Sequence, residues 1–155
     1  DNGAWPESPD GNGFSLIRID PAGDRDPNLG IEWRPSIEAG GNPGTSDSIA
    51  FSGENSSDLL AYTVPEIDDL TTRINKDGKL VVTVRQKLGA DDALIELEQS
   101  TDGITWARLT DGDGIELTER THNGDGTESL EYKIISKDLN NQDPAILFRA
   151  AVRLR

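Results

Sequence analysis

The sequence has 155 residues, enough for one ordinary domain but not for two full-sized cores. Its 29 acidic and 15 basic residues give a formal net charge of −14, so the average surface repels nucleic-acid phosphates and anionic lipids. There are no cysteines, which excludes disulfides, thiolate metal sites and cysteine nucleophiles. No run approaches the roughly 18 apolar residues of a membrane-spanning helix. Nucleic-acid binding and membrane insertion are therefore disfavoured, and the absence of methionine and of a leader-like segment predicts a processed or excised chain.

The first part of the chain, residues 1–46, is rich in prolines, glycines and other turn formers. Only Phe14 to Ile19 has a clear strand pattern there. Residues 47–69 are predicted to be a linker. Within the linker, Ser56-Ser57-Asp58 precedes Leu59 to Tyr62 and would cap a single helical turn, which Pro65 would end.

From residue 70 to residue 155 short apolar-alternating runs are separated by turn signals, which is typical of a sandwich. The predicted fold is all-β, an immunoglobulin-like antiparallel β-sandwich with a long loop-rich N-terminal segment. The expected strands are 79–87, 93–99, 104–109, 115–121, 128–135 and 146–154. Alternation predicts that ten side chains share the core face: Leu80, Val82, Val84, Leu130, Tyr132, Ile134, Phe148, Ala150, Val152 and Leu154.

The last predicted strand carries arginines on its other face. Alternation turns Arg149, Arg153 and Arg155 away from the core, toward solvent or toward a second surface. Such a row can meet an acidic partner, for example a neighbouring copy, or can simply be a solvated strand face. These three residues are the candidate partner-binding set.

Aspartates gather in several predicted loops. If every strand crosses the sandwich, loops 88–92, 110–114 and 136–145 lie at one end and loops 75–78, 100–103 and 122–127 at the other. The first end then collects Asp91, Asp92, Asp111, Asp113, Asp138 and Asp143. Calcium takes six to eight oxygen ligands, so this set is a candidate Ca²⁺ site, although Asp-Gly is also common in ordinary turns. A smaller cluster, Asp20, Asp24 and Asp26, is a weaker candidate.

No set of residues indicates an enzyme. His122 is the only histidine, and it adjoins the turn at 123–126 without the serine elbow of a nucleophilic triad. Pairs of carboxylates suited to glycoside hydrolysis are expected by chance among 29 acids. We therefore interpret His122 as a surface-turn residue and predict a non-catalytic chain.

The N-terminal segment resembles a known family. The residues that carry the similarity are Trp5-Pro6, Asp10-Gly11-Asn12-Gly13-Phe14-Ser15-Leu16-Ile17-Arg18-Ile19-Asp20-Pro21, Trp33-Arg34-Pro35-Ser36 and Gly40-Gly41-Asn42-Pro43-Gly44-Thr45. They resemble the closing third of a bacterial lamin-tail domain, an immunoglobulin-like sandwich of large secreted or surface proteins. The resemblance implies an incomplete sandwich, because the earlier strands of that family are absent from this chain.

A second similarity covers much of the remaining chain. It rests on Ile49-Ala50-Phe51-Ser52-Gly53, Leu59-Leu60-Ala61-Tyr62, Leu88-Gly89-Ala90-Asp91-Asp92 and Glu98-Gln99-Ser100-Thr101-Asp102-Gly103-Ile104-Thr105-Trp106. These runs are similar to the C-terminal β-module that often follows lamin-tail segments in verrucomicrobial and planctomycete-type proteins. The resemblance implies an extracellular or cell-surface location and supplies no catalytic residues.

Two functions from different classes follow. The first is a structural or assembly module whose unpaired strand edges are completed by a partner chain or a neighbouring copy. The alternative is a carbohydrate-binding accessory module of a secreted polysaccharide-degrading enzyme, which would need exposed aromatic rings in one groove. The available rings are Trp5, Trp33, Tyr62, Trp106 and Tyr132, and core packing is the favoured interpretation of each.

Overall fold

The structure is a computed structural model that describes residues 5–66, 70–135 and 146–155. Its elements in chain order are β1 (Leu16–Arg18), the 3-10 helix η1 (Gly30–Glu32), β2 (Trp33–Pro35), α1 (Ser56–Thr63), β3 (Leu70–Ile74), β4 (Leu80–Lys87), β5 (Ala93–Ser100), β6 (Ala107–Arg108), β7 (Thr110–Asp111), β8 (Gly114–His122), β9 (Thr127–Ile134) and β10 (Leu147–Leu154).

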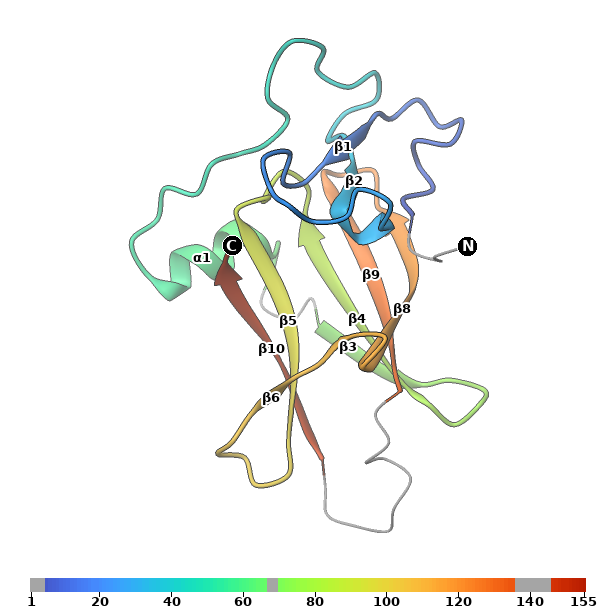
Figure 1. The fold of residues 1–155 in the computed structure, drawn as a ribbon, viewed down its shortest axis with the longest axis vertical. Coiled ribbons are helices and arrows are strands. Elements are labelled where there is room, and N and C mark those ends of the chain that lie inside the picture. The colour runs from blue at the N-terminus through green and yellow to red at the C-terminus, as the bar shows by residue number, and fades with distance from the viewer. Residues whose placement is uncertain (1–4, 67–69, 136–145) are drawn as a thin grey trace.

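The strands form two packed sheets and a short ribbon (Figure 1). One sheet has the order β3-β4-β9-β8-β7 and the other the order β10-β5-β6, while β1 pairs with β2. Every pairing is antiparallel except that between β7 and β8. The predicted all-β sandwich is therefore confirmed.

The core lies between the two sheets, and period-two alternation builds it. Val82, Val84 and Ile134 are almost fully buried, and they pack with Leu97 of the opposite sheet and with Ile115. Each side chain of this size that leaves water stabilises the fold by about 1.5–3 kcal/mol. The prediction for β4 and β9 is confirmed, since Leu80, Leu130 and Tyr132 also pack in the two core clusters.

For β10 the predicted face is right but the predicted burial is not. Phe148 packs against the core, whereas Ala150 is exposed and Leu154 is 54% exposed. The physical reason is that β10 is an edge strand, paired only with β5 among the described residues. Its inward side chains therefore meet an opening instead of a second layer.

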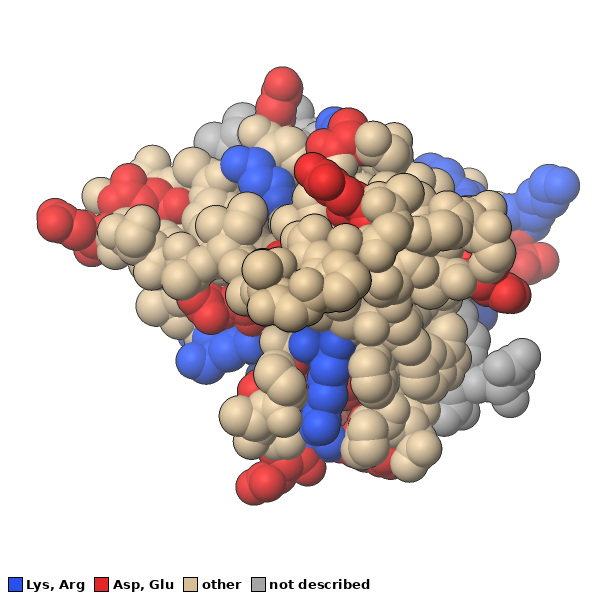
Figure 2. Space-filling view, turned by 90° about the horizontal axis from the view of Figure 1, so that it is seen from above, with Lys and Arg blue, Asp and Glu red and all other residues tan. Residues whose placement is uncertain are grey.

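The N-terminal segment covers one end of the sandwich. In Figure 1 the β1–β2 ribbon and η1 lie across the upper ends of the sheets, above β5, β4 and β9. Figure 2 looks down on this end, where the centre of the surface is neither acidic nor basic and charged groups lie around it. We call residues 5–46 the cap. They pack on the sandwich of their own chain, through contacts described below.

The predicted helix is present and longer than one turn. Its N-cap is Asn55, whose side-chain Oδ1 accepts from the backbone N–H groups of Ser57 and Asp58 at 2.9 and 3.0 Å. It ends at Thr63, two residues before Pro65, whose ring disfavours a helical conformation of the residue before it. The predicted cap at Ser56 to Asp58 is thus shifted to Asn55.

Several strand predictions were wrong, and the short strands β2 and β7 were not predicted. Of the predicted strand 104–109, only Ala107 and Arg108 form β6, because the Asp102 carboxylate accepts from the N–H groups of Ile104 and Thr105 and holds them in a turn. The strand β3 was not predicted. Its sequence, Leu-Thr-Thr-Arg-Ile, shows little apolar alternation, and none of its side chains is buried in the structure. In the part of the chain that the structure describes, no helix has the length and apolar character needed to cross a membrane.

Candidate functional site

Arg34 of β2 joins the cap to the sandwich through a buried ion network. Its Nε and Nη2 donate to the two carboxylate oxygens of Asp91 at 2.6 and 2.7 Å, and its Nη1 donates to Asp47 at 2.8 Å. The side chains of Arg34 and Asp47 are each 3% exposed. Burial alone would lower the pKa of Arg34, but the hydrogen bonds that it donates to Asp91 and Asp47 outweigh this effect and raise the pKa above its ordinary value. The arginine is therefore a structural cation.

A second buried arginine, Arg120 of β8, binds the cap from below. It forms a bidentate pair with Glu128 of β9, with Nη2 at 2.9 and 3.0 Å from the two carboxylate oxygens. Its Nη1 donates to the backbone carbonyls of Gly30 and Trp33 at 2.9 and 2.6 Å. A bidentate guanidinium fixes direction as well as charge. Arg120 therefore positions η1 and β2 on the five-stranded sheet.

Aromatic contacts complete the attachment of the cap. The Phe14 ring packs on the His122 ring with centroids 4.2 Å apart, and His122 Nδ1 accepts from the Gly124 N–H. His122 is thus a half-buried packing residue at a turn. Trp5 stacks on Trp33 at 6.2 Å.

A small cavity of about 60 Å³ lies beneath the cap, between the sheets. Arg34, Arg120, Tyr132 and Arg155 are among its lining residues. Burial raises the pKa of Tyr132. Desolvation and the nearby charge of Arg25 lower the pKa of Arg155. The cavity belongs to the polar junction between cap and core.

Of the candidate calcium ligands that the structure describes, Asp91 and Asp92 lie apart from Asp111 and Asp113. Asp91 is bound to Arg34, and the Asp92 carboxylate accepts from the Phe51 N–H at 2.8 Å. Asp111 lies at the opposite end of the five-stranded sheet, where its carboxylate accepts from the Leu117 N–H, and Asp113 forms the turn beside it. Asp138 and Asp143 lie outside the described residues. Within the described ranges, no three acidic or histidine side chains form a metal-binding group.

The shortness of β6 explains why these two pairs of aspartates are separated. Since β6 has only two residues, the chain does not cross the sandwich between β5 and β8, and the described loops 110–114 and 122–127 lie at the ends opposite to those predicted. Loop 88–92 therefore lies beside the turn at 123–126, as the hydrogen bond from Leu88 to Gly126 shows, while loop 110–114 leads into the far end of β8. Of the weaker cluster, Asp26 is used by Asn28 in a local turn.

The outer face of the three-stranded sheet carries a dense Arg–Glu ladder. Glu98 of β5 pairs with Arg149 and Arg153 of β10 at 2.6 and 2.7 Å, and Glu96 pairs with Arg153 and Arg108 at 2.7 and 2.8 Å. The two carboxylates are only 4% and 6% exposed, because the arginines lie over them. Arg149 also lies over the Trp106 ring, with Cζ 4.1 Å from its centroid.

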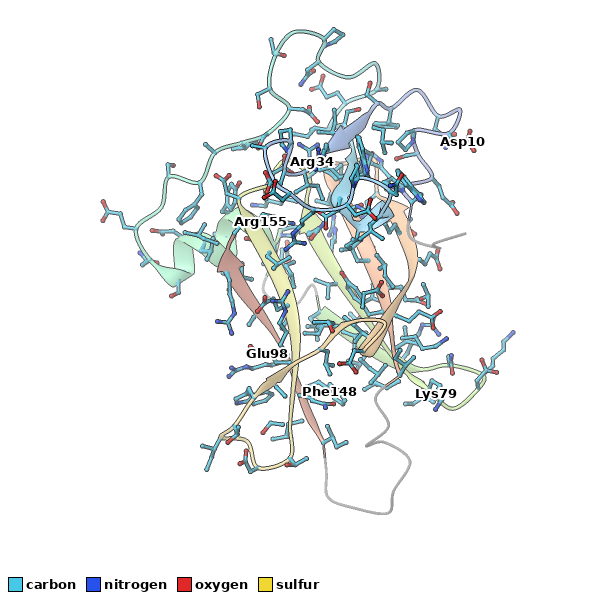
Figure 3. The ribbon with its side chains drawn as sticks, viewed as in Figure 1. Asp10, Arg34, Lys79, Glu98, Phe148 and Arg155 are labelled. Atoms are coloured by element: carbon cyan, nitrogen blue, oxygen red, sulfur yellow. The ribbon has the colours of Figure 1, made fainter. Side chains whose placement is uncertain are left out.

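Arg155, the third residue of the predicted row, is separate from this ladder. Its backbone N–H donates to the Asp92 carbonyl, and its side chain lines the cavity under the cap. Figure 3 shows the separation, since Glu98 and Phe148 lie low on the sandwich and Arg155 lies near Arg34 at the capped end.

Glu98 gives the ladder a dependence on pH. Hydrogen bonds from Arg149 and Arg153 lower the pKa of Glu98 below its ordinary value of 4.5. A carboxyl with a depressed folded pKa contributes stability that is present above the unfolded pKa and is lost as the pH falls through the folded pKa. We expect the Tm of the wild type to fall more steeply than that of E98Q between neutrality and pH values below 4.5, measured by circular dichroism.

The control for this prediction is E116Q, which removes an exposed carboxylate paired with Lys133 on the other sheet. Its acid limb should follow that of the wild type. Parallel acid limbs for E98Q and the wild type would show that Glu98 contributes nothing to the acid sensitivity.

One side of the sandwich is open. The edge strands β10 and β3 end the two sheets there, and an apolar groove of about 250 Å³ lies between them. Its lining residues include Leu60, Leu70, Val84, Ala150 and Val152. The helix α1 bounds the groove at one end, where it contacts β10. In the described part of the chain, no residue pairs with the free edge of β10 along its eight residues.

The aromatic rings do not form a shared platform. Trp5 and Trp33 cover each other, Trp106 is covered by Arg149, and Tyr62 packs against Phe51 at 5.3 Å. Each of these described rings is in contact with a neighbouring side chain. A carbohydrate stacking site therefore has no support from the ring geometry.

Searches of family models, of curated proteins and of solved structures returned no match to this chain. The lamin-tail resemblance of the N-terminal segment stays a prediction.

Proposed function

We propose that this chain is a non-catalytic assembly module of a secreted or surface protein, and that it binds a partner by accepting an extended strand on the free edge of β10. Strand addition of this kind obtains affinity from main-chain hydrogen bonds and specificity from alternate side chains. The observation that carries the proposal is the unpaired eight-residue edge beside the apolar groove.

The location of the open edge differs from the sequence-based expectation. The resemblance implied that residues 1–46 would present the incomplete edges. Arg34 and Arg120 instead bind this segment to its own sandwich, and the open side lies between β10 and β3. A strand added to β10 would extend the smaller sheet on the side where the groove opens, and every second side chain would face inward.

Selection of short random peptides displayed on phage tests the proposal. The wild-type chain should enrich extended sequences. The edge variant A150K should not, because an inward-pointing charge on an edge strand opposes strand addition. Ala150 is exposed, so the substitution is compatible with folding.

The matched control is T72K. Thr72 is paired with the core residue Val82, so it faces inward on β3, the edge strand of the other sheet. This variant should enrich the same peptides as the wild type. Absence of enrichment on the folded wild-type chain, or loss of binding in T72K but not in A150K, would contradict the proposal.

A further inference from the structure

The outer face of β10 carries more positive than negative charge. Arg149 and Arg153 lie on β10 itself, whereas their partner carboxylates, Glu98 and Glu96, lie on the neighbouring strand β5 and are only 4% and 6% exposed, in a chain whose overall charge is −14. The Arg149 and Arg153 side chains are 47% and 57% exposed. The surface beside the free edge is therefore a local exception to the acidity of the molecule.

These two arginines have unused hydrogen-bonding capacity. Each uses Nε and Nη2 on the β5 side, and no Nη1 contact of either is formed within the described residues. A guanidinium has five N–H donors in a planar fork, so each arginine can bind a further carboxylate without releasing the first.

The strand β5, which already pairs with β10, indicates which sequence pattern β10 accepts on its other edge. On β5, Glu98 stands opposite Arg149, and Glu96 stands opposite Ala151, the outward-facing residue between the two arginines. The alternate side chains of β5, Ile95 and Leu97, point into the core. The sequence beside β10 thus alternates apolar inward with acidic outward.

Resting on the proposed function, we infer that the strand accepted on the free edge belongs to a partner polypeptide and also alternates apolar with acidic residues, in a pattern such as apolar-Glu-apolar-Glu. Its apolar side chains enter the groove lined by Ala150, Val152 and Leu70. Its carboxylates bind Arg149 and Arg153 from the open side. Charged hydrogen bonds of this kind are about twice as strong as neutral ones.

Two fluorescent peptides test this inference. One has the sequence of β5, ALIELEQS, and the other, ALIQLQQS, replaces both glutamates by glutamine. Anisotropy titration with the full chain should give binding at least about tenfold tighter for the glutamate peptide at low salt. The preference should shrink in high salt, because the arginines are half exposed.

The variant R149Q should reduce the preference for the glutamate peptide, with Arg153 still holding Glu98. The control R73Q removes an equally exposed arginine, paired with Glu131 on the other sheet, and should leave the preference unchanged. Circular dichroism confirms that both variants are folded.

The possible failures are distinguishable. Equal binding of the two peptides, abolished by A150K, would overturn the acidic preference and leave strand addition intact. Binding of neither peptide, while phage selection enriches other sequences, would also overturn this inference alone. A dimer in sedimentation that A150K abolishes would assign the edge to a second copy and overturn the assignment to a partner polypeptide. If neither assay finds a peptide whose binding depends on β10, the proposed function itself is overturned.

Discussion

Replacing Arg34 by alanine is expected to lower the free energy of unfolding by about 3–5 kcal/mol, the usual effect of leaving a buried charge without its partner. Two carboxylates, Asp47 and Asp91, would lose their cation in a site that is at most 9% exposed. Urea unfolding measures the loss. Because a domain has only about 5–15 kcal/mol of net stability, this is a large share of the total.

The control is R73A, which breaks an exposed pair with Glu131. Exposed pairs contribute about 0–1 kcal/mol, so this variant should unfold close to the wild type. If R34A loses no more than R73A, the junction between cap and sandwich does not depend on the buried network.

Replacing Arg120 by methionine is the second change with a large expected effect, again about 3–5 kcal/mol, since Glu128 is 1% exposed and would lose its bidentate partner. The cap should also loosen, because the carbonyls of Gly30 and Trp33 lose their donor. Limited proteolysis should then cut within residues 5–46 faster than in the wild type.

The double variant R120M/E128L separates these two effects. Apolar residues that replace both members of a buried pair often restore stability, so the free energy of unfolding should recover in large part. The proteolysis of the cap should not recover, because the carbonyls still lack Arg120. Full recovery of both would show that Arg120 stabilises only through Glu128.

The sandwich core could be predicted because its strands carry a strong local signal. The runs from Val82 to Arg85 and from Leu130 to Ile134 alternate apolar and polar residues, and this alternation predicts the face that packs in the core. Val81, on the opposite face of β4, is also only 2% exposed. The sequence of β3 has no such signal, and its apolar residues Leu70 and Ile74 are 38% and 65% exposed in the structure. An edge strand of this kind is determined by pairing with its neighbour, which sequence periodicity does not contain.

The candidate sites were less predictable because their contacts join distant parts of the chain. Arg34 lies 57 residues from Asp91, and nothing around Arg34 in the sequence marks it as buried. The side of β10 that bears Arg149 and Arg153 followed correctly from alternation. Their pairing with Glu96 and Glu98 depends on the register of β10 against β5. The sequence does carry one signal, the two glutamates within an otherwise apolar strand.

The loop positions show how one local error spreads. The turn held by the Asp102 carboxylate, whose pKa is lowered to about 2 by its hydrogen bonds with Thr105 and Ile104, shortens the next strand to two residues. Because the chain does not cross the sandwich here, Asp111 and Asp113 lie at the end opposite to the predicted one. The described aspartates of the candidate calcium set are apart for this topological reason.

Amide hydrogen exchange, followed residue by residue by NMR, tests most directly whether β10 accepts a strand. The chain would be measured alone and with the tightest-binding peptide from the selection. Our account predicts new protection at alternate amides of Leu147–Leu154, the pattern produced by added inter-strand hydrogen bonds. Protection confined to β3 or to the cap, or unchanged exchange along β10 in the saturated complex, would contradict it.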